Sequence, residues 1–404
     1  MDVAPPIRLL VFSTLYPNAA APRHGIFVEN RLRHLLSSGS VSARVVAPVP
    51  WFPFRRGPFG AYRRYAAAPK AETRHGIDIT HPRYLVVPKI GMSLAPDTLY
   101  RATKHHVAAL RRQGTDFDII DAHYFYPDGV AAIRLGALFG KPVTITGRGT
   151  DLNLIPDHPG PRRAIQWAAR HSAHNITVSA ALRDVLTETL GVPDDRVTVL
   201  RNGVDTTQFA PRDRAACRAK LAVNGRVILS VGHLIERKGH HLVIDALTRL
   251  RDVTLLIAGE GPEESALQAR AQSRGVAERV RLLGAVPHHE LPAIYTAADA
   301  LVLASSREGW ANVLLEAMAC GTPVAATGVW GAPELITCAE AGLLIPERTP
   351  AAIAEGVGRL LAAPPQRAAT RAFAELFSWD ATTNGQLAIF RRLMADRCVP
   401  AGSE

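Results

Sequence analysis

Short apolar runs rich in β-branched residues alternate with longer stretches of helical period along the whole chain. This alternation is typical of repeated βα units, which build parallel sheets covered by helices. In the first half we expect strands at Ile7–Phe12, Ala43–Ala47, Ile119–Asp121, Val143–Thr146, Ile176–Val178 and Val197–Leu200. In the second half we expect them at Val227–Val231, Thr254–Ala258, Val280–Leu283, Ala300–Ala304, Pro323–Ala326 and Leu343–Ile345. Each half can therefore form its own doubly wound sheet.

The length of the chain predicts two domains. Its 404 residues exceed what one hydrophobic core normally serves. The turn sequence Asn202-Gly203-Val204-Asp205 marks the boundary, so we predict one Rossmann-like domain over residues 1–205 and another over residues 206–404. Ligands of open parallel sheets bind at the carboxyl ends of the strands. Two such sheets facing one another would enclose a cleft.

The net charge of +11 is concentrated in the first domain. Residues 1–205 hold 26 Lys and Arg against 16 Asp and Glu, whereas the remainder holds 21 against 20. The stretch Trp51–Tyr65 interleaves aromatic rings with four arginines. This composition suits an anionic membrane surface, although single-stranded nucleic acid or an ordinary solvated loop would also accommodate it. We favour peripheral membrane attachment.

Targeting and redox signals point to a cytoplasmic protein on the inner face of the cell membrane. Residues Met1–Arg8 lack the basic start and apolar core of a signal peptide, and no apolar run approaches about 18 residues. The cysteines are widely spaced, which suits neither a disulfide framework nor a zinc site. They are Cys217, Cys320, Cys338 and Cys398, and we expect reduced thiols.

The segment from Glu308 to Glu316 carries the strongest chemical signal. It follows the strand predicted at Ala300–Ala304, and a helix is expected from Asn312 to the stop signal Gly321-Thr322-Pro323. A helix N-terminus offers backbone N–H groups to a diphosphate, and two nearby carboxylates can accept hydrogen bonds from sugar hydroxyls. Taken alone, two glutamates at this spacing are more often solvated surface charges.

This segment resembles the Glu-x7-Glu motif of retaining glycosyltransferases of family 4, which have the GT-B fold, including bacterial enzymes of the polysaccharide and teichuronic acid type. Further matching segments follow in the expected order: Leu200–Asp205, Leu229–Gly239, Ile257–Pro262 and Tyr295–Asp299. The resemblance implies that Glu308 contacts the donor sugar and that Glu316 holds the ribose of a nucleotide diphosphate sugar. It extends the donor site to Gly309, Trp310, Ala311, Asn312 and Val313.

The resemblance also assigns cations to the donor diphosphate. Lys238 follows the first strand of the second domain and would neutralise the charge that develops on the leaving phosphate. The family usually has an arginine after Val-Gly, where this chain has His233, so Arg237 would compensate. In the first domain Gly25 stands in the loop where many relatives have two glycines. We expect it to contribute to donor binding.

Three residues at strand ends of the first domain complete the predicted site. His123 follows the strand at Ile119–Asp121 and resembles the family's histidine that touches the donor sugar. Asp151 matches an acidic residue on the acceptor side of the family, and Arg148 stands where a histidine is common. The resemblance therefore implies His123, Glu308 and Lys238 as catalytic residues, with Asp151 and Arg148 on the acceptor side.

The predicted function is transfer of a hexose-type unit from a UDP- or GDP-sugar to a hydroxyl of a glycan or lipid-linked acceptor, with retention, in bacterial surface polysaccharide synthesis. We expect no cofactor and no metal, because no paired His and Cys ligand set or Asp-x-Asp segment suggests a metal site. The resemblance further implies a terminal helix at about 380–397 that crosses back to the first domain. A nucleotide-sugar epimerase of the same architecture is the alternative. A nucleic-acid-binding protein would explain the charge but not Glu308 and Glu316, so no nucleic-acid partner is expected.

Overall fold

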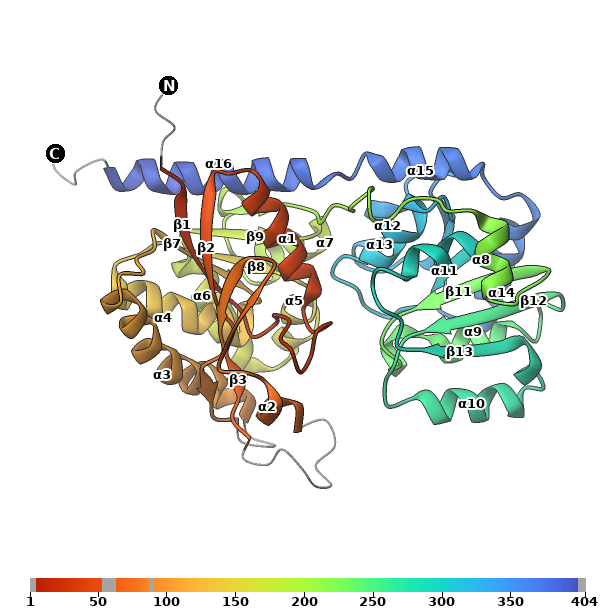
Figure 1. Ribbon diagram of the computed structural model, residues 1–404, viewed down its shortest axis with the longest axis horizontal. Coiled ribbons are helices and arrows are strands. Elements are labelled where there is room, and N and C mark those ends of the chain that lie inside the picture. The colour runs from red at the N-terminus through yellow and green to blue at the C-terminus, as the bar shows by residue number, and fades with distance from the viewer. Residues whose placement is uncertain (1–4, 53–62, 87–90, 399–404) are drawn as a thin grey trace. The chain divides into compact units, whose positions relative to one another are not determined.

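The computed structural model describes residues 5–52, 63–86 and 91–398, and the chain divides into two compact units (Figure 1). One unit extends to Arg201 and also contains the chain from Asp380 onward, and the other is Asn202–Trp379. The division after Arg201 falls four residues before the position that the turn sequence indicated. The terminal segment belongs to the first unit.

In the described part of the first unit, eight strands form a sheet in the order β10-β9-β8-β7-β1-β2-β5-β4. Neighbouring strands are parallel except β4 and β5, which form an antiparallel hairpin at the edge. The strands are β1 (Ile7–Phe12), β2 (Val41–Val46), β4 (Ala71–Arg74), β5 (Ile77–Thr80), β7 (Ile119–His123), β8 (Val143–Gly147), β9 (His174–Thr177) and β10 (Val197–Val199). A separate parallel pair joins β3 (Val49–Pro50) and β6 (Arg83–Tyr84).

The helices of the first unit include the last helix of the chain. They are α1 (Ile26–Ser37), α2 (Arg63–Ala67), α3 (Gly91–Arg112), α4 (Val130–Phe139), α5 (Thr150–Asn153), α6 (Pro159–His171), α7 (Ala180–Asp184) and α16 (Trp379–Cys398). Leu387 and Phe390 of α16 lie in one buried cluster with Leu9 of β1 and Val28 and Leu32 of α1. The terminal helix is therefore part of this unit's hydrophobic core.

The second unit is a fully parallel, doubly wound sheet in the order β13-β12-β11-β14-β15-β16. Its strands are β11 (Arg226–Val231), β12 (Val253–Ala258), β13 (Val280–Gly284), β14 (Ala300–Leu303), β15 (Val324–Thr327) and β16 (Gly342–Ile345). Its helices are α8 (Arg214–Lys220), α9 (His240–Ala246), α10 (Glu264–Ser273), α11 (Leu291–Ala297), α12 (Asn312–Ala319), α13 (Ala332–Leu335), α14 (Pro350–Ala362) and α15 (Arg367–Glu375).

The strand orders locate a switch point in each sheet, where the chain leaves neighbouring strands in opposite directions. In the second unit this point lies between β11 and β14, and in the first it lies between β1 and β7. Ligands of doubly wound sheets bind at the carboxyl ends of the strands beside such a point. A ligand-binding site is therefore expected in the loops after β1, β7, β11 and β14.

Candidate active site

The loops after β11 and β14 are joined by three polar contacts at the switch point of the second unit. The backbone N–H of Ser306 donates to the carbonyl of Arg237 over 2.9 Å, and Arg237 Nη1 donates to the carbonyl of Arg307 over 2.6 Å. Between them, Lys238 Nζ lies 2.6 Å from Glu308 Oε1. Lys238 and Glu308, which the sequence placed in separate motifs, therefore form one ion pair.

The carboxylate of Glu308 is buried and strongly stabilised in its charged form. Burial alone would raise its pKa, but Lys238 and Arg237 hold the pKa below its usual value. Ser305 Oγ also donates to Oε1 over 2.6 Å, while Arg237 Nη1 lies 3.8 Å from Oε2. Glu308 is thus an ionised hydrogen-bond acceptor at neutral pH.

Gly239 allows the two loops to approach this closely. Its φ is +73°, and a Cβ atom added there would lie 2.0 Å from the carbonyl oxygen of Ala304. Any other residue would therefore collide with the end of β14 in addition to adopting a left-handed conformation. The position directly after Lys238 requires glycine for both reasons.

Glu316 lies on α12, as predicted, and its carboxylate has two partners that the sequence did not single out. Tyr295 of α11 donates its hydroxyl to Oε2 over 2.9 Å, and His288 Nε2 lies 3.2 Å from Oε1. Burial opposes protonation of His288, but Glu316 raises its pKa above the ordinary value. In the neutral ring, Nδ1 accepts from Gln208 Nε2 over 3.0 Å, so Nε2 carries the proton and donates to Glu316.

The other predicted donor residues divide into buried and accessible positions. Trp310 is buried, and its indole N–H donates to the carbonyl of Asn202 over 3.0 Å. Asn202 in turn donates from its amide to Asn312 Oδ1 over 3.2 Å. These contacts fix the start of α12, which gives Trp310 and Asn312 structural roles. Gly309 and Ala311 are buried, Val313 is half-buried and His233 is exposed.

His123 lies at the end of β7 beside the first unit's switch point, and both of its ring nitrogens face protein groups. Arg148 Nη2 donates to Nδ1 over 2.7 Å, and Asp121 Oδ2 lies 3.4 Å from Nε2. Burial lowers the pKa of His123 to about 4, with Arg148 adding to the effect and Asp121 opposing it. His123 is therefore neutral at pH 7, with its proton on Nε2.

Asp151 and Gly25 both hold loops in place. The Asp151 carboxylate is fully buried and accepts hydrogen bonds from the backbone N–H groups of Phe125, Arg148 and Gly149 at 2.8 to 3.0 Å. Gly25, with φ +70°, stands so close to Leu15 that an added Cβ would lie 2.2 Å from its carbonyl oxygen. Their roles in acceptor and donor binding stay predictions.

Asp128 is a further buried carboxylate that sequence reasoning did not select, although it lies in the segment that contains His123. Its oxygens accept hydrogen bonds from the backbone N–H and the hydroxyl of Thr14, in the loop after β1. Burial raises the pKa of Asp128 to about 7. The contact joins the segments after β1 and β7. Its signal in the sequence was an acidic residue five positions after the end of β7.

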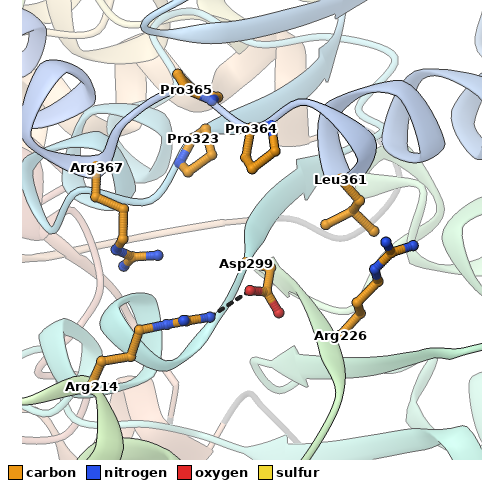
Figure 2. Close-up of a pocket in the computed structure, with 8 residues that line it drawn as sticks. All are labelled: Arg214, Arg226, Asp299, Pro323, Leu361, Pro364, Pro365 and Arg367. Carbon is orange, nitrogen blue, oxygen red and sulfur yellow. Dashed lines mark hydrogen bonds and ion pairs between the residues drawn. The ribbon is translucent and has the colours of Figure 1, made fainter.

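A pocket of about 190 Å³ lies at the opposite edge of the second unit's sheet, where β11, β14 and β15 begin (Figure 2). Arg214 Nη2 lies 2.5 Å from Asp299 Oδ1. The guanidinium of Arg367 donates hydrogen bonds to the main-chain carbonyls of Ala298 and Thr296 over 3.0 and 3.1 Å. These contacts hold the start of α15 against the sheet. Residues of the predicted site do not line this pocket.

The described residues contain neither a metal-binding cluster nor a membrane-spanning helix. Within residues 5–52, 63–86 and 91–398, no group of three His, Cys, Asp or Glu side chains is arranged to hold a metal ion. Over the same ranges, no helix has the length and apolar character needed to span a membrane.

Comparison with protein families gives two matches that together cover most of the chain. The family described as glycosyl transferases group 1 matches residues 213–376, and the family described as glycosyltransferase family 4 matches residues 62–208. The first match lies within the second unit, and the other lies in the first unit except for its last seven residues. The matches confirm the family that the motifs indicated.

Individual relatives agree with the family models. A D-inositol 3-phosphate glycosyltransferase of Frankia alni is 32% identical over 311 residues, which cover 70% of this chain and 76% of that protein. A putative teichuronic acid biosynthesis glycosyltransferase, TuaC of Bacillus subtilis, is 27% identical over 363 residues, which cover 87% of this chain and 89% of that protein.

The solved structure of Anabaena HepE in complex with UDP-glucose has a similar fold. It matches with a TM-score of 0.71 at 20% identity, covering 96% of this chain and 99% of that one. A likeness at this identity bears on the fold alone. The predicted GT-B fold class, with two parallel-sheet units, is confirmed.

Proposed function

The chain belongs to the glycosyl transferases group 1 and to glycosyltransferase family 4, and from this membership we propose that it transfers a hexose-type unit from a nucleotide diphosphate sugar to an acceptor hydroxyl, with retention. The acceptor is a glycan or a lipid-linked glycan of a bacterial surface polysaccharide. The name of TuaC supports the polysaccharide role, and the UDP-glucose complex of HepE supports the donor class.

The observation that carries the proposal is the Lys238–Glu308 ion pair at the switch point of the second unit. A diphosphate placed there would be near two cations, Lys238 and Arg237, and their charge would offset the negative charge that develops as the sugar bond breaks. The ionised Glu308 carboxylate would accept hydrogen bonds from sugar hydroxyls. With these cations offsetting the charge of the leaving diphosphate, the reaction would need no metal ion.

Glu316 is suited to hold the ribose. Tyr295 and His288 each donate one hydrogen bond to it, which fixes its orientation. A carboxylate has about four acceptor positions, so two remain for the vicinal hydroxyls of a ribose. Retention would follow if the acceptor attacks on the face from which the phosphate leaves, with the leaving phosphate oxygen accepting the acceptor's proton.

Membrane attachment through the first unit is the second part of the proposal. Of the eight large apolar side chains exposed among the described residues, five lie next to the β3–β6 pair or at the start of α3, and we infer that they form one apolar patch. The patch consists of Trp51, Leu85, Val86, Met92 and Leu94. Arg63 and Arg64 of α2 are exposed in the adjoining segment, whereas Arg55 and Arg56 lie outside the described residues.

Vesicle binding tests this attachment. Each fully buried leucine contributes about 1.5 to 3 kcal/mol, and each basic residue about 1 kcal/mol at an anionic surface. The wild-type protein should co-sediment with vesicles of phosphatidylglycerol and phosphatidylcholine, and Trp51→Ser with Leu85→Ser should abolish this. Trp167→Ser, an exposed tryptophan on α6 of the same unit, is the matched control. Equal vesicle binding by all variants would reject the patch as the membrane-binding surface.

A panel of UDP-, GDP- and ADP-sugars tests the donor proposal. A ligand at a hundred times its Kd stabilises the folded protein by about 2.7 kcal/mol, which a thermal unfolding curve detects. We expect one member of the panel to raise the unfolding temperature. A transferase should turn over little donor without an acceptor, whereas the alternative epimerase would consume it. No shift with any member would count against donor binding.

A further inference from the structure

The carboxylate of Asp121 is the centre of a buried polar network in the first unit. Thr144 Oγ1 donates to Oδ1 over 2.9 Å, while Oδ2 lies 3.4 Å from Nε2 of His123. Asp121 is 1% exposed and His123 is 2% exposed. A carboxylate so deeply buried requires compensating donors, because an unpaired buried charge is costly.

Another hydrogen-bond donor to Asp121 comes from α16, the last helix of the chain. Gln386 of α16 donates from Nε2 to Asp121 Oδ2 over 2.9 Å, although the two residues are 265 positions apart. The other end of the same amide, Oε1, accepts a hydrogen bond from Nε of Arg31 over 3.0 Å. Gln386 is 1% exposed and Arg31 is 2% exposed.

The orientation of this amide is fixed by its neighbours. The cation Arg31 requires an acceptor, and the anion Asp121 requires a donor, so a flipped amide would present the wrong atom to both. The Gln386 side chain therefore accepts a hydrogen bond from Arg31 and donates one to Asp121. In this arrangement Asp121 faces the Nε2–H group of His123. Arg148 donates to the opposite nitrogen, Nδ1.

Packing alone does not explain a glutamine at this position. Leu387 and Phe390 already anchor α16 in the core, and Thr382 donates to the carbonyl of Arg201. Replacing only one partner of a buried hydrogen bond leaves the other unsatisfied, so an apolar side chain here would leave Arg31 Nε without its acceptor. What an apolar side chain would not supply is a donor for Asp121.

We propose that Gln386 is a positioning residue, which acts through Asp121 to hold the imidazole of His123 as a single neutral tautomer with its proton on Nε2. The inference rests on the proposed function, because the orientation of His123 affects transfer only if substrate reaches the end of β7. It assigns the terminal helix a part in the site chemistry, in addition to its place in the core.

Nuclear magnetic resonance of the His123 ring tests the positioning without any substrate. In the wild-type protein the Nε2–H proton should give a slowly exchanging resonance, because it is buried against Asp121. Gln386→Leu should broaden or remove this resonance. Thr382→Val removes a different buried hydrogen bond from the same helix and should preserve it, which makes it the matched control. Survival of the resonance in Gln386→Leu would overturn the proposal.

Turnover of the donor selected from the sugar panel supplies the second readout. Small misplacement of a group at a reacting centre costs up to about a hundredfold in rate, so we expect Gln386→Leu to lower kcat about tenfold with little change in donor KM. A loss no greater than that of Thr382→Val would contradict the positioning role. Failure of every donor to bind would instead reject the proposed function, and the resonance would still report on Gln386.

Discussion

The ammonium group of Lys238 lies 2.6 Å from Oε1 of Glu308, across the switch point between β11 and β14. The pair is largely shielded from water, with side-chain exposures of 14% and 9%. A nucleotide sugar bound at these loops would meet a cation and an anion already held next to one another. The strength of this pair can be measured in the protein without ligand.

Lys238→Met should destabilise the second unit by about 3 kcal/mol at pH 7, because removal of one partner leaves a buried charge uncompensated. The loss should shrink as the pH falls towards 4, since protonation of Glu308 removes that charge. Urea unfolding curves at several pH values measure both effects. Lys220→Met, which replaces an exposed lysine of α8, should change the unfolding free energy by less than about 0.5 kcal/mol. Equal effects of the two variants would contradict a buried pair.

Two glycines with the same backbone conformation test whether the loops after β11 and β14 need a glycine in order to approach closely. Gly239→Ala should prevent the second unit from folding normally, because the new Cβ would lie 2.0 Å from the Ala304 carbonyl oxygen. Gly225 has a φ of +66° with no atom within 4 Å of an added Cβ, so Gly225→Ala should cost only about 1 to 2 kcal/mol. Circular dichroism with thermal unfolding distinguishes the two. Similar losses of stability in the two variants would show that the close approach of Gly239 to Ala304 is unimportant.

His288 makes stability depend on pH with a defined sign. Its folded pKa is raised above the ordinary 6.5, with Glu316 outweighing the opposite effect of burial. The charged contact therefore contributes its full stability below about pH 6.5, and this is lost as the pH rises through the folded pKa. The unfolding free energy of wild type minus that of His288→Gln should accordingly fall between pH 6 and pH 9. His289→Gln, whose side chain is 79% exposed, should show no such change.

Most of the two sheets could be predicted from the sequence, because buried parallel strands are continuous apolar runs. All twelve expected strands are present with small differences at their ends, and α12 begins at Asn312 as predicted. The β4–β5 hairpin was missed because its first strand, Ala71–Arg74, is partly exposed and has no apolar alternation. An edge strand needs little apolar surface, so its sequence resembles that of a loop.

The site was predictable only where its residues lie in local motifs. Glu308, Glu316 and Lys238 follow strands in recognisable segments, so their placement near a sheet edge could be inferred. The partnership of His288 with Glu316 could not, because a lone histidine 28 positions away has no pattern that indicates its contact. Gln386 was missed for the same reason. Such side-chain pairs are determined by tertiary packing.

Calorimetric titration of the nucleotide sugar that gives the largest thermal shift tests directly whether Glu316 binds the donor. Glu316→Ala should weaken donor binding at least about tenfold, because it removes hydrogen bonds from a charged acceptor to the ribose. Glu308→Ala should keep much of the affinity while losing transfer. Tight binding to the wild-type protein that depends on Glu316 is the expected result. Unchanged affinity in Glu316→Ala would contradict it.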